Sequence, residues 1–401
     1  MAKASVDIRS LMTGAAGAGP SSWAAAPGRQ VAISFGGGLP DPATFPIEEL
    51  IADVATVLRR DGDAALQYGG LVGYDGLRES IAERSRRADG RAVDGGNVVL
   101  TSGSAHALSL TCFAFVSAGD TVLIEAPTFA GSLRAIRSYG GRLVTVSVDE
   151  RGMSVDDLEE KLAALKAEGR RPKLLYTIPN FHNPAGVTMS LERRRRLVRL
   201  AQEWQFLVVE DDAYGDLRYD GEPLPSLFAL DDSGLVLKLG SFSKILAAGL
   251  RMGWAIGDSE VVGALTSVRH DMGVSPMVAR IIAEFSKVRL EPHIQRLIAH
   301  YRDKRDRMVA ALGEHCAPWV RFTTPEGGFF LWLELAPGVD PDALAQATAG
   351  EDVGYVPGPA FFADGDGRRN LRLAFSFVPS DDIERGIAGL GRALSRSARP
   401  T

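Results

Sequence analysis

The clearest indication of the fold lies in residues 174–214, LLYTIPNFHNPAGVTMSLERRRRLVRLAQEWQFLVVEDDAY. It begins with a short apolar run, Leu174–Ile178, and passes through a turn rich in proline, asparagine and glycine. A helical segment, Ser190–Trp204, and a second buried run, Phe206–Glu210, follow. Since parallel strands need a crossover connection, usually a helix, this order predicts a parallel βαβ unit.

The same alternation extends through the middle of the chain. Further strands are expected at Asn97–Thr101, Thr121–Glu125, Arg142–Val148 and Leu235–Leu239, and helices at Ala105–Ser117, Phe129–Tyr139 and Val155–Ala167. We therefore expect an α/β fold with a mostly parallel central sheet covered by helices. Ligands of such sheets bind at the carboxyl ends of the strands, so the residues just after each strand are the candidate site.

The pattern changes after about residue 290. A long charged helix is expected at Pro292–Leu312, followed by a pair of antiparallel strands at Trp319–Thr323 and Gly327–Glu334. A helix at Asp340–Ala349, a strand at Arg369–Ser376 and a final helix at Asp381–Ser395 are expected after them. This order predicts a smaller α+β domain. Residues 1–30, interrupted by glycine and proline, are expected to form a mobile arm.

Composition excludes several classes of protein. The chain has 401 residues, with 45 basic and 50 acidic side chains and a net charge of −5. This charge argues against nucleic-acid binding, and no apolar run is long enough to span a membrane. Cys112 and Cys316 are too few for a disulfide framework or a Cys-rich metal site, so no metal is expected. Without the apolar core of a secretory signal, the cytoplasm is the expected location.

Lys244 is the candidate nucleophile. Lysine is scarce, with eight residues against 37 arginines. Lys244 follows the strand Leu235–Leu239 among small hydroxyl and apolar residues, without an adjacent carboxylate. Desolvation there disfavours the ammonium and frees the amine to form a Schiff base. The alternative is a lysine whose stem packs while its head reaches solvent.

Two segments are candidate anion sites. Arg251 lies between glycines close to Ser241 and Ser243, a pattern that suits a bidentate cation with hydroxyl donors; a plain surface arginine is the alternative. The turn Thr101–His106 joins a strand to a helix, where Ser104 and backbone N–H groups suit a phosphate. Ser104 alternatively caps its helix.

Acids and an amide follow two further strands. Glu210, Asp211 and Asp212 precede Tyr214, and one carboxylate there is suited to hold a heteroaromatic nitrogen protonated, although acids at a strand exit are usually solvated or capping. Asn183 lies in the Asn-Pro-Ala-Gly turn, as either a turn former or a ligand donor.

These segments together resemble the pyridoxal 5′-phosphate (PLP) enzymes of fold type I, and more narrowly the class I/II aminotransferases of the 2-aminoadipate/kynurenine/valine–pyruvate branch. The resemblance runs from about Ser34 to the C-terminal helix. Its markers are GGGLPDP (36–42), LQY (66–68), SGS (102–104), EAPTF (125–129), IPNFHNP (178–184), EDDAY (210–214), SFSK (241–244), GLRMGW (249–254), VPG (356–358) and LRLAFS (371–376).

The resemblance implies a role for each candidate. Lys244 would form the internal aldimine, Asp211 would pair with the pyridine nitrogen, and Phe129 would stack on the ring. Tyr214 and Asn183 would bond the phenolic oxygen. The phosphate would lie on Ser104, the backbone of Ala105, Ser241, Ser243 and Arg251, with Tyr68 of a neighbouring subunit. Arg372 would clamp the substrate carboxylate, and Gly38 would leave room beside the substrate.

The implied protein is a homodimer with shared active sites that acts on an amino acid and a 2-oxo acid. Its parts would be the arm 1–30, a segment 31–70 contributing to the small domain and the dimer interface, a PLP-binding domain 71–290 and a small domain 291–401. A PLP-dependent lyase, decarboxylase or oxidative deaminase is the alternative. The sensor half of a GntR-type regulator is disfavoured by the acidic charge and by a family region that starts near residue 34.

The chain departs from the family pattern at several positions. His106 and His182 stand where the family commonly has glutamine, and Phe129 stands where it usually has tyrosine. Histidine near a cofactor can act as acid or base. The alternative, that both are ordinary polar replacements for glutamine, is favoured.

Overall fold

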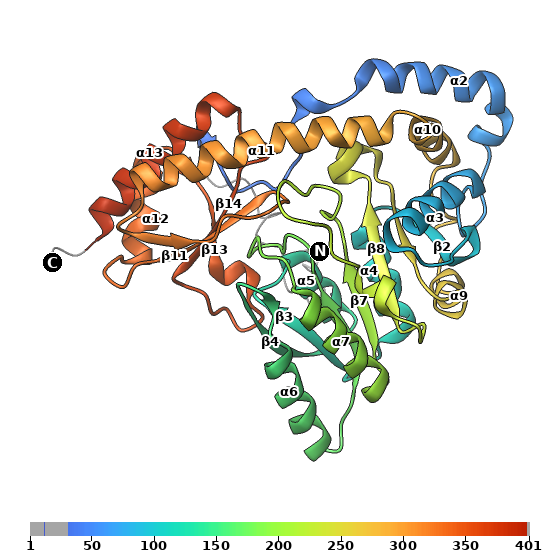
Figure 1. Cartoon of the computed structure of the whole chain (residues 1–401), viewed down its shortest axis with the longest axis horizontal. Coiled ribbons are helices and arrows are strands. Elements are labelled where there is room, and N and C mark those ends of the chain that lie inside the picture. Colours follow the sequence, from blue (N-terminus) through green and yellow to red (C-terminus); the bar gives the residue numbers. More distant parts are fainter. Residues whose placement is uncertain (1–11, 13–30, 399–401) are drawn as a thin grey trace, which may run out of the picture.

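Eight strands form the central sheet, in the order β2-β9-β8-β7-β6-β3-β4-β5 (Figure 1). Their bounds are β2 Val98–Thr101, β3 Thr121–Ala126, β4 Arg142–Asp149, β5 Gly152–Met153, β6 Pro172–Thr177, β7 Leu207–Asp211, β8 Val236–Ser241 and β9 Gly253–Ile256. The strands from β8 through β7, β6 and β3 to β4 pair in parallel. β9 runs antiparallel to β8 and β2, and β5 runs antiparallel to β4. The predicted α/β class with a mostly parallel sheet is confirmed.

Residues 174–214 form the βαβ unit that the sequence predicts. Helix α7 (Leu191–Trp204) begins where Ser190 accepts a hydrogen bond from the N–H of Arg193, and ends at Gln205 in the left-handed conformation. Leu197 and Ala201 of α7 are buried against the sheet. Since β6 and β7 are adjacent and parallel, the unit places its two strand exits at one edge.

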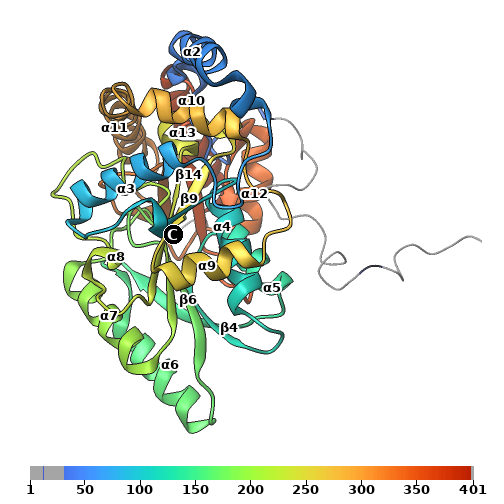
Figure 2. The same ribbon diagram turned by 90° about the vertical axis from the view of Figure 1, so that its right-hand side faces the viewer.

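Helices cover both faces of this sheet (Figure 2). Strand residues alternate between two cores, so that Leu174 and Tyr176 face one side and Leu175 the other. One core includes α4 (Ser104–Phe115), α5 (Ala130–Ser138) and α9 (Ser259–Ser267). The other includes α3 (Asp75–Asp89), α6 (Val155–Ala167) and α7, with the short α8 (Leu227–Leu230). This period of two is that of a strand buried on both faces.

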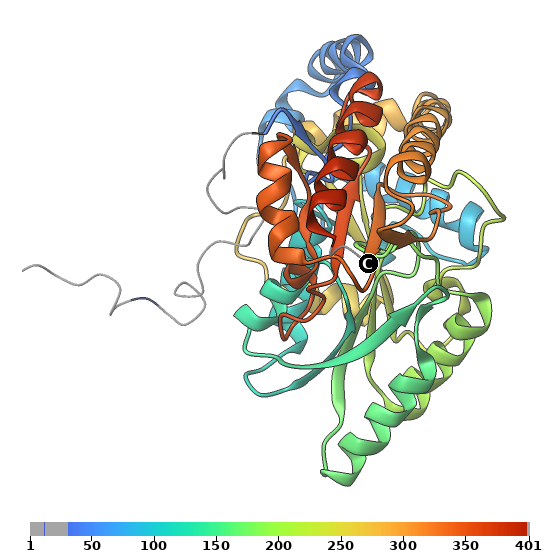
Figure 3. The same cartoon turned by 90° about the vertical axis from the view of Figure 1, so that its left-hand side faces the viewer.

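The C-terminal part is the predicted α+β unit. Helix α11 (Leu290–His315) runs from the large sheet towards a second, antiparallel sheet in the order β10-β11-β14-β13 (Figure 1). Its strands are β10 Val320–Phe322, β11 Phe330–Leu335, β13 Val356–Pro357 and β14 Asn370–Ala374. Helices α12 (Pro341–Gly350) and α13 (Ser380–Ser397) lie beside it (Figure 3).

The computed structural model describes Met12 and residues 31–398, so the predicted arm lies, except for Met12, outside the described residues. β1 (Ile33–Ser34) pairs with β12 (Val353–Gly354) of the C-terminal part. Helix α2 (Ile47–Leu66) packs on α10 (Pro276–Ser286) through Val57, Ala65 and Ile281. No helix within the described ranges is long and apolar enough to cross a bilayer.

Candidate active site

Strand register brings the two predicted anion segments together. Thr101 at the end of β2 and Ser241 at the end of β8 both pair with Gly253 on the strand between them, β9. A Cβ on Gly253 would lie 2.7 Å from the backbone of Gly103 and 2.7 Å from the carbonyl oxygen of Gly240. The two segments therefore converge at one edge because a glycine lets their backbones approach.

The turn before α4 presents its backbone to this edge. Gly103 has a φ of 88° and occupies the N-cap position without a side-chain cap, so Ser104 is the first helical residue and the capping alternative for Ser104 is wrong. The amides of the first helical turn, which include those of Ser104 and Ala105, have no intrahelical acceptor. Arg251 reaches the same turn, donating from Nη2 to the carbonyl oxygen of Ser102 at 3.1 Å.

Lys244 follows β8 in a π-helical turn, Ser243–Ala247. Its Nζ donates to the carbonyl oxygen of Gly38 at 2.7 Å. Burial, reinforced by the charges of Arg372 and Arg251, lowers the pKa of the Lys244 amine to about 8. The predicted desolvated lysine is therefore present, and its amine is deprotonated more readily than an exposed lysine.

Asp211 ends β7 with only 9% of its surface exposed. Its Oδ2 accepts a hydrogen bond from the Tyr176 hydroxyl at 2.7 Å, whereas its buried Oδ1 has no partner among the described residues. Burial raises the pKa of the Asp211 carboxyl to about 6, against the lowering effect of the Tyr176 bond. A buried oxygen without a partner calls for a donor that the described part of the chain does not supply.

The neighbouring acids are already engaged. Glu210 accepts the backbone N–H groups of Leu227 and Phe228 at the start of α8. Asp212 pairs with Lys238 Nζ at 3.3 Å and accepts from Asn180 at 2.8 Å. Of the three acids, Asp211, to which the resemblance assigns the ring nitrogen, therefore has the buried oxygen without a partner among the described residues.

Arg372 on β14 connects the two parts of the chain at the site. It donates to the side-chain oxygen of Asn183 at 2.9 Å and to the carbonyl oxygen of Gly36 at 2.7 Å. The guanidinium carbon lies 4.3 Å from the Phe330 ring centre, and Nε has no partner among the described residues. Burial lowers the pKa of Arg372 to about 10.

Aromatic side chains surround these groups. Tyr214 is 7% exposed and meets Phe329 and Phe330 edge-on, each at 5.6 Å between ring centres. Burial raises the Tyr214 pKa above its usual value, and the Asn183 side chain offsets part of this effect. Phe129, the N-cap residue of α5 after β3, packs partly buried against the core that contains Tyr176.

The two histidines make structural hydrogen bonds. His182 is buried, with Nε2 3.1 Å from Glu125 Oε2, and its Nδ1 accepts from the Ala185 N–H at 3.2 Å. His106 Nδ1 accepts from the Ser102 N–H at 3.1 Å. Both rings therefore hold turns next to the site through hydrogen bonds.

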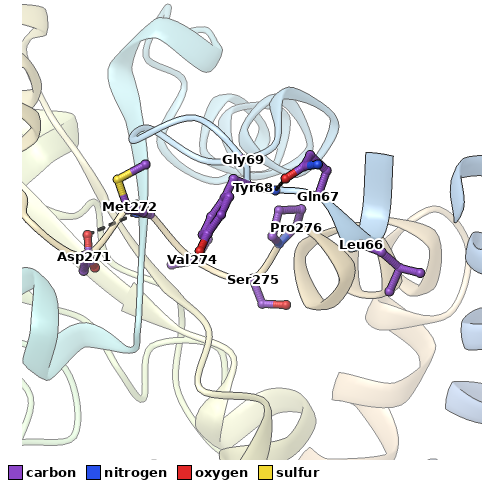
Figure 4. Close-up of a pocket in the computed structure, with 10 residues that line it drawn as sticks. Leu66, Gln67, Tyr68, Gly69, Asp271, Met272, Val274, Ser275 and Pro276 are labelled. Carbon is purple, nitrogen blue, oxygen red and sulfur yellow. Dashed lines mark hydrogen bonds between the residues drawn. The ribbon is translucent and has the colours of Figure 1, made fainter. Parts of the chain in front are cut away.

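Tyr68 lies on the surface and is 79% exposed (Figure 4). With residues 66–69 and 271–276 it lines a cavity of about 440 Å³, and none of the other predicted site residues lines it. Asp271 on this cavity lies 3.6 Å from His106 in the first turn of α4. Within the described chain, Tyr68 is therefore separate from the Lys244 group.

Sequence reasoning did not identify three residues next to the site: Tyr176, Glu125 and Phe330. Tyr176 and Glu125 point from strand interiors, so their contacts depend on which strands are neighbours. Phe330 begins β11, close to the expected strand start, but its position over Arg372 depends on the pairing of β11 with β14.

The chain is similar to known aminotransferases. Residues 36–390 match the family described as aminotransferase class I and II. Aromatic-amino-acid aminotransferase 1 of Thermococcus litoralis is 39% identical over 92% of this chain and 89% of its own length. The 2-aminoadipate transaminase of Thermus thermophilus is 39% identical over 90% of each chain. The crystal structure of Pyrococcus horikoshii kynurenine aminotransferase in complex with PMP superposes with a TM-score of 0.92 at 36% identity, over 98% of this chain and 99% of that one.

The residues present fit pyridoxal phosphate. The cofactor needs an amine for its aldehyde, an acid for its ring nitrogen and donors for its phosphate. Lys244 has a half-buried amine of lowered pKa. The buried Oδ1 of Asp211, which has no partner among the described residues, lacks the donor that a protonated ring nitrogen provides. The glycine-led turn and Arg251 offer an anion site beside them.

Because the family match spans residues 36–390, the chain belongs to the class I and II aminotransferases, PLP-dependent enzymes of fold type I that move an amino group between an amino acid and a 2-oxo acid.

Proposed function

We propose that the candidate residues hold the cofactor and substrate in the roles that the resemblance implies. Lys244 would bond the cofactor covalently, Asp211 would pair with the ring nitrogen, Phe129 would contact the ring face, and Tyr214 and Asn183 would bond the phenolic oxygen. Ser104, Ala105, Ser241, Ser243 and Arg251 would hold the phosphate, and Arg372 the substrate carboxylate. The observation that carries this proposal is the free, buried Oδ1 of Asp211 at the same sheet edge as Lys244.

The bound cofactor supplies an electron sink for the bonds of the substrate α-carbon. The chain's own contribution is proton handling and orientation. Once the substrate amine has displaced it from the cofactor, the Lys244 amine would be free again. With a pKa that burial lowers to about 8, it would be partly unprotonated near neutral pH and would accept the proton of the α-carbon. Arg372 would fix the carboxylate end of the substrate by a bidentate contact. Gly38 would let the backbone approach beside the substrate, since a Cβ at this position would collide with the Phe330 ring.

We propose aromatic α-amino acids as the substrate class. Two of the relatives, the aromatic-amino-acid and kynurenine aminotransferases, are named for such substrates. Phe330 lies next to both Gly38 and Arg372, and Tyr214 meets it edge-on. An aromatic substrate side chain favours such edge-to-face surroundings.

A single-turnover comparison tests this substrate class. The PLP-loaded protein is mixed separately with phenylalanine, tyrosine, kynurenine and 2-aminoadipate, and the change of the cofactor absorbance is followed together with the 2-oxo acid formed. We expect the aromatic substrates to react with the higher kcat/KM. A higher kcat/KM for 2-aminoadipate would contradict the proposal and favour the activity for which the Thermus relative is named.

We also propose a homodimer in which Tyr68 completes the partner's phosphate site. Helix α2 carries exposed apolar side chains outside its packed contact with α10, among them Ile47, Ile51 and Leu58. Leu66 and Tyr68, at the end of α2 and just after it, are 73% and 79% exposed. An exposed apolar surface of this kind marks an interaction site. Asp271 connects the Tyr68 cavity to the turn that begins α4.

The remaining proposals concern organisation and location. We propose the division into the segment 31–70, the PLP-binding domain 71–290 and the small domain 291–401, which the pairing of β1 with β12 supports. The cytoplasm is the proposed compartment, in keeping with Cys112 and Cys316 as free, buried thiols.

A further inference from the structure

The Tyr176 hydroxyl contacts the carboxylate that faces the proposed cofactor site. Tyr176 lies on β6 with 0% of its surface exposed, and Asp211 ends the adjacent strand β7. The hydroxyl donates to Asp211 Oδ2 at 2.7 Å. Because Tyr176 lies on one strand and Asp211 is the last residue of the next, the sheet itself holds the carboxylate in place.

This contact makes the two oxygens of Asp211 different. Oδ2 is held, while Oδ1 is buried without a partner in the described part of the chain. A carboxylate held by one oxygen cannot turn freely, so its other oxygen keeps a constant direction. Rigid support of this kind is what keeps a binding group in its productive geometry.

The charges around Asp211 make this side-chain donor important. Asp212, the residue just after β7, and Glu125 on β3 are acids that disfavour its charged form, as does burial itself. The Tyr176 hydroxyl and the backbone N–H of Ala213 favour the charged form. The charge of Asp211 in turn acts on two other titratable groups, since it raises the pKa of Lys244 and that of Tyr214. Among the side chains around Asp211, the Tyr176 hydroxyl donates the hydrogen bond that opposes protonation of the Asp211 carboxylate.

We infer that Tyr176 is a positioning residue of the transamination reaction, which holds Asp211 charged and directs its free oxygen at the ring nitrogen of the cofactor. This inference rests on the proposed role of Asp211. Tyr176 does not touch the cofactor in this account and acts only through the carboxylate. Loss of the hydroxyl therefore changes how cofactor binding depends on pH.

The test is the affinity of the cofactor-free protein for PLP, measured by fluorescence from about pH 5 to pH 9. The PLP affinity of the unsubstituted protein should decrease as the pH falls below a midpoint that is set by protonation of Asp211. In Tyr176→Phe we expect this midpoint to rise by about one pH unit, because a hydrogen bond to a charged group is lost. Affinity near pH 6 should then fall about tenfold, with little change near pH 9.

The PLP analogue 1-deazapyridoxal phosphate, which has no ring nitrogen, provides the second arm. With this analogue Tyr176→Phe should bind as tightly as the unsubstituted protein. Tyr219→Phe is the matched control, since Tyr219 is also buried and its hydroxyl donates to the Gly328 carbonyl oxygen. It should lower the melting temperature and leave the midpoint unchanged. If Tyr176→Phe does not fold, Tyr176→Met also removes the hydroxyl.

Three results would overturn the inference: an unchanged midpoint in Tyr176→Phe, an equal loss of affinity at all pH values, or the same loss with the deaza analogue. Failure of the underlying proposal is a distinct result. If the unsubstituted protein binds PLP and the deaza analogue with identical pH dependence, Asp211 does not serve the ring nitrogen.

Discussion

Asp211 and Asp212 are adjacent acids in different surroundings. Asp212 is neutralised by Lys238, whereas Asp211 retains one free buried oxygen. We predict that Asp211→Asn lowers kcat by about 100-fold or more, because a neutral amide cannot stabilise a protonated ring nitrogen. Steady-state kinetics of the PLP-loaded variant measures this.

Asp212→Asn is the matched control. It should retain most turnover and instead cost about 1–3 kcal/mol of stability, since Lys238 loses one of its two carboxylate contacts and keeps Asp89. Near-normal turnover in Asp211→Asn together with a large loss in Asp212→Asn would reverse the assignment.

Arg372 is the proposed carboxylate clamp. In this structure its guanidinium donates to Asn183 and Gly36 and leaves Nε free. We predict that Arg372→Ala raises KM for the amino acid about 10- to 100-fold, the loss expected for charge-assisted hydrogen bonds. The dissociation constant of PLP should change much less. A KM that stays unchanged would place the carboxylate on another group.

At the scale of elements, the segment 36–42 lies between the two parts of the chain and carries the carbonyls of Gly36 and Gly38, which accept from Arg372 and Lys244. A Cβ on Gly38 would lie 2.5 Å from the Phe330 ring. We predict that Gly38→Ala destabilises the fold by about 1–3 kcal/mol and raises KM, because the segment must shift away from Phe330. Thermal unfolding and steady-state kinetics measure the two effects.

Gly37→Ala is the control within the same segment. Its Cβ would meet Leu39 at 3.7 Å, an ordinary contact, so stability and KM should stay close to those of the unsubstituted protein. Equal effects of the two substitutions would mean that the contact with Phe330 is not the cause.

The sequence predicted the elements with strong periodicity and not the contacts between distant ones. The expected helix Val155–Ala167 has the observed bounds, and the βαβ unit at 174–214 is present. β9 was not expected, because its four residues, Gly253–Ile256, lie next to the anion motif and show little alternation. Lys244 and Asp211 were found from their positions after strands and from the family resemblance, and Arg372 from the resemblance alone. The Tyr176 contact was not found, because it depends on the neighbour relation of β6 and β7.

At the scale of the whole molecule, we expect a second copy of the chain to pack on the exposed apolar side chains of α2. Ile51 is 57% exposed on α2. We predict that Ile51→Asp weakens the dimer, because a charge replaces apolar area whose burial stabilises by about 1.5–3 kcal/mol. Sedimentation velocity should show more monomer, together with weaker PLP binding from the loss of the partner's Tyr68.

Val288→Asp is the matched control, since Val288 is 73% exposed and lies outside α2. It should leave the dimer and PLP binding unchanged. A monomeric unsubstituted protein with full PLP affinity would contradict the shared site.

The most direct measurement locates the covalent attachment of the cofactor. The PLP-loaded protein is reduced with borohydride, digested and analysed by mass spectrometry. We predict one phosphopyridoxyl group on the peptide that contains Lys244 and none on the half-buried Lys238 or the buried Lys304. Attachment at another lysine, or no attachment in a protein saturated with PLP, would contradict it.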